Sequence, residues 1–195
     1  MTAISSLESI HKKGLFGNHH KKKESDLIQI SEVKNLTIIQ VVNYKKSKIQ
    51  LKDIFIDNLK LPLKNLEVSS NKETRILWNS PNTWLIVSFK EDIIDKIKKS
   101  FNEKDFAVTD ISHSRAVIKI KGFNSKEIIK KGCPLNLNIM KKNNCAGTVF
   151  SGINILIDFE EDNPETFNLF VLRSFGESFY HHITDAALEH GFLGS

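Results

Sequence analysis

Residues 110–115, with the sequence DISHSR, bring together the side-chain types of a nucleophilic active site. An aspartate, a histidine and a serine could form a relay in which the histidine takes the proton of the serine hydroxyl. The relay requires the histidine to lie between the other two, which three near-neighbours on one segment cannot arrange. Asp110 and Ser112 lie two positions apart at a predicted strand end and project to the same side. We predict that they cap a turn, which Arg115 stabilises, and that no catalytic residue lies here.

The histidines and cysteines do not have the spacing of a metal site. His181 and His182 are consecutive, so on a helix they point about 100° apart and cannot chelate one ion as an i, i+4 pair would. Cys133 and Cys145 lack C-x-x-C spacing. No Walker loop and no G-x-G-x-x-G motif occurs. The sequence therefore predicts no metal site and no cofactor site in this chain.

Arginine is rare in this chain, and its positions are informative. Only three of the 28 basic residues are arginine, namely Arg75, Arg115 and Arg173. Each adjoins a predicted strand, and the planar fork of arginine binds carboxylates and carbonyls in a way that lysine cannot. Ser174 follows the third arginine and is suited to cap the last helix. We interpret these four residues, like the aspartate and serine above, as structural or interface positions.

The composition is that of a folded, water-soluble protein, with 195 residues of which 40% are hydrophobic and 26% charged. No run approaches the roughly 18 apolar residues of a membrane span, and residues 1–26 lack the apolar stretch of a secretory signal. We expect a cytoplasmic protein without a membrane partner. The net charge of +5 comes from lysines scattered among acids, so a nucleic-acid partner is not expected.

Strands and helices are interleaved along the chain, which predicts an α+β fold with mixed or antiparallel sheets. The predicted strands span residues 36–42, 74–78, 83–89, 107–112, 115–122, 152–159 and 167–173. The predicted helices span residues 51–59, 91–101, 123–132 and 174–191. Residues 1–26 are predicted to be an extended arm, and residues 27–193 a single domain of two lobes, about 27–105 and 106–193.

The predicted helix over 123–132 has strong start signals. Asn124 is suited to the N-cap and Glu127 completes a capping box, while Phe123 can pack onto Ile128 as a hydrophobic staple.

Four segments resemble the gamma subunit family of heterotetrameric sarcosine oxidase: RILWNSPNTWLIV, VTDISHSRAVIKIKGFNSKEIIKKGCPLNL, CAGTVFSGINILI and FNLFVLRSFGESFYHHITDAALEHG. The likeness covers about residues 70–192. It implies a fold similar to the folate-binding domain of the glycine-cleavage T-protein, with two ferredoxin-like lobes. It also implies a complex that oxidatively demethylates sarcosine to glycine and releases hydrogen peroxide, and that forms methylene-tetrahydrofolate when tetrahydrofolate is present.

The resemblance also implies partners and the location of cofactors. Alpha, beta and delta subunits would be the partners, and they would hold FAD, FMN, NAD, zinc and tetrahydrofolate, so that this noncatalytic chain binds none. In T-protein relatives a glycine-rich loop followed by acidic residues lies near folate. Residues 145–163 have large apolar residues and no Gly-Gly pair before adjacent aspartates, which argues against folate binding here. Two alternatives stay open: a free-standing folate-dependent one-carbon enzyme, and an RNA-modification accessory of the same fold.

Overall fold

The computed structural model describes residues 5–195 and divides the chain into two compact units. The smaller unit consists of residues 35–112 and 143–145, and the larger unit contains the rest. The smaller unit is thus built mainly from the segment between two strands of the larger one, β2 (Ile28–Glu32) and β10 (Arg115–Lys121). This division differs from the predicted lobes 27–105 and 106–193, because β2 pairs with β10 across a long stretch of sequence.

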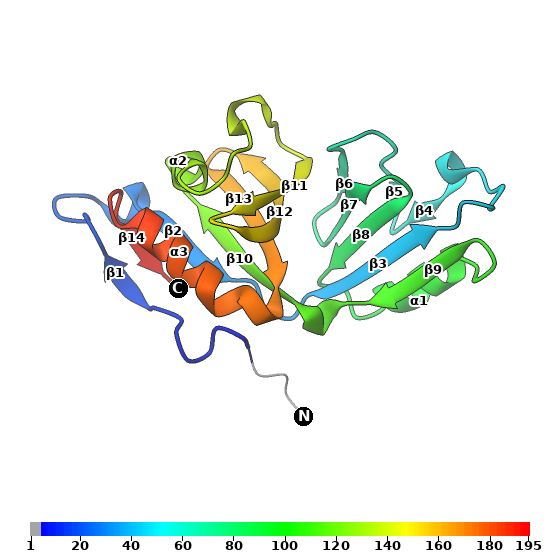
Figure 1. Cartoon of the computed structure of the whole chain (residues 1–195), viewed down its shortest axis with the longest axis horizontal. Helices are drawn as coiled ribbons and strands as arrows, with labels where there is room; N and C mark the ends of the chain where they lie inside the picture. Colours follow the sequence, from blue (N-terminus) through cyan, green and yellow to red (C-terminus); the bar gives the residue numbers. More distant parts are fainter. Residues whose placement is uncertain (1–4) are drawn as a thin grey trace. The chain divides into compact units, whose positions relative to one another are not determined.

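A seven-stranded sheet forms the centre of the larger unit, in the order β1-β14-β2-β10-β13-β12-β11 (Figure 1). β14 and β2 run parallel, whereas β2–β10, β10–β13 and β13–β12 are antiparallel. The other strands are β1 (Gly14–Phe16), β11 (Asn144–Phe150), β12 (Ile153–Asp162), β13 (Glu165–Leu172) and β14 (Phe192–Gly194). The helices are α2 (Ser125–Lys130) and α3 (Gly176–Ala187), with 3-10 turns at Glu24–Asp26, Leu137–Ile139 and Arg173–Phe175.

The core of the larger unit lies between this sheet and the two helices, which contact one another and β13 (Figure 1). Alternate side chains of the central strands face the helices, as the period of two in a strand requires. Ile118, Ile157 and Leu169 come from the strands, Ile128 from α2 and Ile183 from α3, and all five are fully buried.

The smaller unit contains a five-stranded antiparallel sheet in the order β6-β7-β8-β3-β9, and the hairpin β4–β5. Its elements are β3 (Thr37–Asn43), a 3-10 turn (Leu51–Asp53), β4 (Phe55–Ile56), β5 (Leu59–Lys60), β6 (Val68–Ser70), β7 (Thr74–Ser80), β8 (Thr83–Ser88), α1 (Ile93–Ser100) and β9 (Phe106–Asp110). A further 3-10 turn spans Ser112–Ser114. The core joins Trp84 of β8 to Ile93 and Ile97 of α1. The predicted α+β class with mixed and antiparallel sheets is therefore confirmed.

One predicted helix, over residues 51–59, is wrong. The apolar spacing of this segment imitates a helix, but the structure has a 3-10 turn followed by the hairpin β4–β5. Asp57 and Asn58 form the hairpin turn with φ of 50° and 65°. Positive φ at both central residues is the mark of a type I′ turn, which Asp and Asn adopt more readily than most residues.

The first part of the chain also differs from the predicted arm. Leu7 is fully buried in the core of the larger unit, and Phe16 stacks on Phe192 with ring centroids 5.2 Å apart. β1 pairs with β14. Residues 5–26 are therefore part of the larger unit, because their few apolar side chains pack onto its C-terminal segment; residues 1–4 lie outside the described part.

The starts of two helices differ in detail from their sequence signals. Phe123 is 87% exposed, so the predicted staple onto the buried Ile128 does not form. Asn124 is the N-cap residue of α2 but its side chain makes no capping bond, and Glu127 pairs with Lys130 at 2.6 Å instead. Ser174 lies inside a 3-10 turn, and the N-cap of α3 is the following residue, Phe175.

Candidate functional site

In the turn after β9, the side chains of Asp110 and Ser112, whose residue types suggest an active site in the sequence, hydrogen-bond to one another. Asp110 Oδ1 accepts hydrogen bonds from the backbone N–H of Ser112 at 2.9 Å and from its hydroxyl at 2.6 Å. The hydroxyl oxygen of Ser112 in turn accepts the backbone N–H of Ile38 at 2.9 Å. The serine and the aspartate thus fasten the end of β9 to β3 in the smaller unit. Both side chains are occupied by hydrogen bonds that hold the turn. A catalytic serine would instead need its hydroxyl beside a general base.

Arg115 begins β10, where it is half-buried and lies opposite Leu172 of β13. Its guanidinium donates to the carbonyl oxygen and the hydroxyl of Ser114, at 3.4 and 3.5 Å. These distances are long for hydrogen bonds, and both acceptors are neutral. Burial lowers the pKa of Arg115, because desolvation disfavours its charged form.

We therefore expect Arg115→Lys to lower the free energy of unfolding by less than about 1 kcal/mol, since only weak neutral hydrogen bonds are lost. Urea unfolding of this variant beside Lys48→Arg, a charge-conserving change at an exposed position, tests the expectation. A loss several times larger than that of the control would show that the fork of Arg115 has a stronger role than its bonds to Ser114.

The other predicted site residues fall into separate places. Arg173 and Ser174 form the 3-10 turn directly after β13, at the same end of the β10–β13 pair as Arg115. Arg75 lies in β7 of the smaller unit, opposite Val87 of β8. The structure thus brings Arg115, Arg173 and Ser174 to one strand end of the larger unit, and Asp110 and Ser112 to one turn of the smaller unit.

A carboxylate of the smaller unit with several hydrogen-bond donors around it is that of Asp57, which the sequence analysis did not single out. Its side chain is 7% exposed and accepts hydrogen bonds from Lys90 Nζ at 2.7 Å, Thr74 Oγ1 at 2.8 Å and Asn71 Nδ2 at 2.9 Å, and Lys96 Nζ lies 3.3 Å away. The bond from Lys90 is the main reason that the pKa of Asp57 lies far below its usual range. The dipeptide Asp-Asn between apolar residues is a hairpin signal that could have located this turn.

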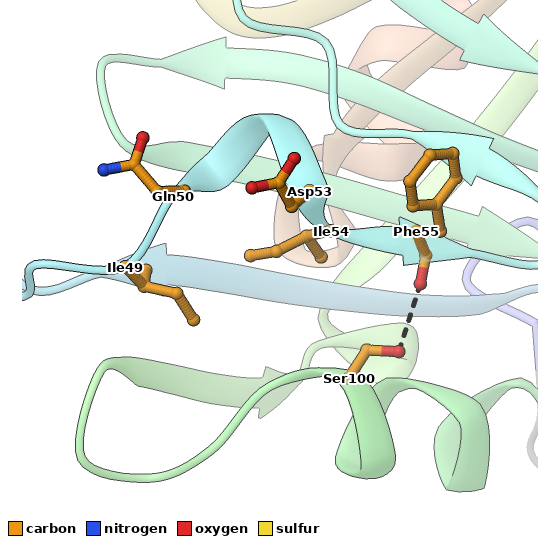
Figure 2. A pocket seen from close by; sticks show the side chains of 6 residues that line it. All are labelled: Ile49, Gln50, Asp53, Ile54, Phe55 and Ser100. Atoms are coloured by element: carbon orange, nitrogen blue, oxygen red, sulfur yellow. Dashed lines mark hydrogen bonds between the residues drawn. The ribbon is translucent and has the colours of Figure 1, made fainter.

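A shallow hollow of about 490 Å³ lies beside the same hairpin, and Figure 2 shows its lining. Apolar side chains of Ile49, Ile54 and Phe55 form much of it, and Ser100 Oγ donates to the carbonyl oxygen of Phe55 at 3.1 Å (Figure 2). The lining contains one carboxylate, Asp53, and no histidine, cysteine or arginine. This hollow lacks the convergent base and nucleophile that hydrolytic or transfer chemistry would need.

Residues 55–189 match the model of the sarcosine oxidase, gamma subunit family. The chain belongs to this family. The match extends well beyond half of the chain and includes the capped turn at Asp110 and the start of α3. It confirms the family resemblance in the sequence.

The fold of this chain is similar to those of solved structures. A chain of the heterotetrameric sarcosine oxidase from Corynebacterium sp. U-96, solved in complex with pyrrole 2-carboxylate, is 17% identical with a TM-score of 0.77, and the match covers 97% of both chains. The glycine cleavage system aminomethyltransferase T from Bartonella henselae is 10% identical with a TM-score of 0.60, over 82% of this chain and 46% of that one. At such identities the likeness shows the fold. No curated protein matches the sequence.

Three further observations concern metal ligands, membrane spans and cysteines. Among residues 5–195, no three His, Cys, Asp or Glu side chains gather closely enough to hold a metal ion. None of the helices in the described part is long and apolar enough to cross a membrane. Cys133 and Cys145 are free thiols, and both are buried.

Proposed function

We propose that this chain is a noncatalytic gamma subunit of a heterotetrameric sarcosine oxidase that works in the cytoplasm. The family match over residues 55–189 carries the proposal. The fold likeness to a chain of such an oxidase over 97% of both chains supports it. The complex would oxidatively demethylate sarcosine to glycine, release hydrogen peroxide, and pass the one-carbon unit to tetrahydrofolate.

The side chains of the chain support a structural contribution to that reaction. Asp110 and Ser112 hold a turn, and Asp57 is surrounded by cations and hydroxyl or amide donors that fix its charge. A carboxylate with a strongly lowered pKa is a poor general base, because its affinity for a proton is small. We propose that the alpha, beta and delta subunits hold the flavins, NAD and zinc, and that tetrahydrofolate also binds outside this chain.

Purification of the chain alone and together with the other three subunits tests the proposal. The isolated chain is expected to lack the visible absorbance of a flavin and to release no peroxide from sarcosine. Co-expressed with its partners, it is expected to elute with them as one complex that oxidises sarcosine. Turnover by the isolated chain, tetrahydrofolate binding by it, or elution apart from the other subunits would contradict the proposal.

A further inference from the structure

The larger unit carries the most exposed large hydrophobic side chain described in this protein, Phe123, with 87% of its surface accessible. Ile139 is also prominent, with 66% exposed. Phe123 lines a hollow of about 620 Å³ together with Asn138, the residue before Ile139. A large exposed apolar side chain beside a concave surface is a candidate for an interaction site. We call the surface formed by Phe123, Ile139 and the lining of this hollow the Phe123 surface.

The backbone beneath Phe123 is firmly held. Gly122 N–H donates to the carbonyl of Glu165 at 2.9 Å, and the hydroxyl of the fully buried Ser125 donates to the carbonyl of Gly122 at 2.7 Å. Gly122 has φ of 144°, and a Cβ there would come within 3.1 Å of Ile28 Cα. The phenyl ring is therefore presented by a rigid support, which reduces the entropy lost when a partner binds.

Ile139 is presented in a similar way. Its 3-10 turn is anchored by Leu137, which is fully buried, and by Met140, which is 5% exposed. The side chain of Asn136 caps this turn by accepting the N–H of Asn138 at 3.1 Å. The exposure of Ile139 thus follows from a turn that directs Leu137 and Met140 into the core.

The lining of the hollow contains three carboxylates, those of Glu127, Asp162 and Glu165, and one lysine, Lys126. Two ion pairs, Lys126–Glu165 at 2.9 Å and Lys130–Glu127 at 2.6 Å, neutralise two of its carboxylates. The remaining carboxylate, that of the exposed Asp162, forms no hydrogen bond or ion pair with another side chain in the part of the chain that the structure describes. An acidic group on the rim of an apolar surface favours a partner that presents a cation beside an apolar side chain.

We infer that the Phe123 surface docks onto another subunit of the oxidase, at a place where an apolar recess lies next to a lysine or arginine. The inference rests on the proposed function and adds the surface used and the chemistry of its partner. A second copy of this chain fits less well, because an isologous contact would place the Asp162 carboxylate on both sides of the contact without adding a cation. An aromatic side chain on a firmly held backbone, surrounded by polar residues, has the anatomy of an interface hot spot.

Binding of the full chain to the complex of the remaining subunits tests the inference. Phe123→Ala is expected to weaken the affinity about 30-fold, the effect of a typical hot-spot truncation. The matched control is Phe89→Ala, because Phe89 is also a well-exposed phenylalanine, at 56%, but lies in the smaller unit. Ile139→Asp should weaken binding strongly, since it places a charge in an apolar contact.

Charge reversal tests the rim. Asp162→Lys is expected to slow association and weaken binding at low salt, whereas Asp53→Lys, at another exposed acid, should have little effect. Thermal melts of all variants should match wild type, since each altered side chain is exposed.

The outcomes separate the two proposals. If the wild-type chain does not bind the remaining subunits, the proposed function fails and the inference fails with it. If wild type binds and Phe123→Ala and Ile139→Asp bind equally well, only the inference is overturned. If wild type self-associates and Phe123→Ala abolishes this self-association, a second copy of the chain occupies the Phe123 surface, and the inference is also overturned.

Discussion

Asp57→Asn is expected to lower the free energy of unfolding of the smaller unit by about 2 kcal/mol or more. The aspartate accepts hydrogen bonds from Lys90 and Thr74 and lies close to Lys96. These contacts join the β4–β5 turn, the start of β7 and helix α1. Asparagine keeps the shape of the side chain but has no charge, and its NH₂ group would meet donors where an acceptor is required.

The same carboxylate predicts a dependence on pH. Hydrogen bonding, above all from Lys90, holds the pKa of Asp57 below its value in the unfolded chain. Its contribution to stability is therefore complete above about pH 4 and is lost as the pH falls further, because the unfolded state then binds a proton that the folded state excludes. Asp57→Asn should remove this part of the acid dependence.

Urea unfolding at neutral pH and at about pH 3 measures both effects. The control is Asp53→Asn, which removes a nearby exposed carboxylate from the same segment. We expect the control to change stability by less than about 0.5 kcal/mol. Equal stabilities of the two variants at neutral pH, or an unchanged acid dependence in Asp57→Asn, would show that Asp57 is solvated and not a structural centre.

The Asp57 hairpin also shows where sequence patterns mislead. Leu51, Ile54, Phe55 and Leu59 have helical spacing, yet the chain turns at Asp57, whose carboxylate is also held by Lys90, more than thirty positions later. Apolar spacing reports periodicity only, and it reveals neither the Asp-Asn turn signal nor a partner distant in sequence. The strands β3, β7, β8, β10, β12 and β13 were predicted because burial imposes a local pattern on them.

The pairing of strands that are distant in sequence could not be predicted from the sequence either. β14 pairs in parallel with β2, with Phe192 opposite Ile28, and neither three- to five-residue segment has a distinctive pattern by itself. The family resemblance succeeded for a different reason. Its motifs, of which the turn at Asp110 is one, combine residue types and spacings over more than a hundred residues, so that chance matches are rare.

The candidate site was predictable in one place and not in another. Asp110 and Ser112 are close in sequence, so their shared turn could be expected from spacing. The exposure of Phe123 could not, because the residues around it carry a valid staple and capping-box signal. In the structure Phe123 follows Gly122, whose backbone lies against Ile28, a neighbour that only the folded sheet provides.

Gly194→Ala is expected to detach the N-terminal segment from the larger unit and to lower its free energy of unfolding by about 2–3 kcal/mol. A Cβ at Gly194 would lie 2.0 Å from the carbonyl oxygen of Lys12. This oxygen belongs to the backbone and cannot rotate away as a side chain could. β1, whose Gly14 lies opposite Gly194, would have to separate from β14.

Several contacts would be lost with β1. The N–H of Lys12 donates to the hydroxyl of Tyr180 at 3.0 Å, and Asn18 N–H donates to the carbonyl of Leu188 at 2.8 Å. Phe16 would leave Phe192, which is fully buried in the intact fold. Burial of such apolar surface contributes on the order of 1.5–3 kcal/mol for each large side chain, so the predicted loss requires only partial release.

Gly147→Ala provides the matched control, because a Cβ at Gly147 of β11 has no neighbour within 4 Å and its φ does not require glycine. Thermal unfolding and trypsin cleavage at Lys21, Lys22 and Lys23 measure the two effects. We expect Gly194→Ala to melt earlier and to be cut faster at these lysines, while Gly147→Ala behaves like wild type. If the two alanine variants melt together and resist trypsin equally, residues 5–26 do not depend on the close approach at Gly194, and the predicted extended arm is the better description of this segment.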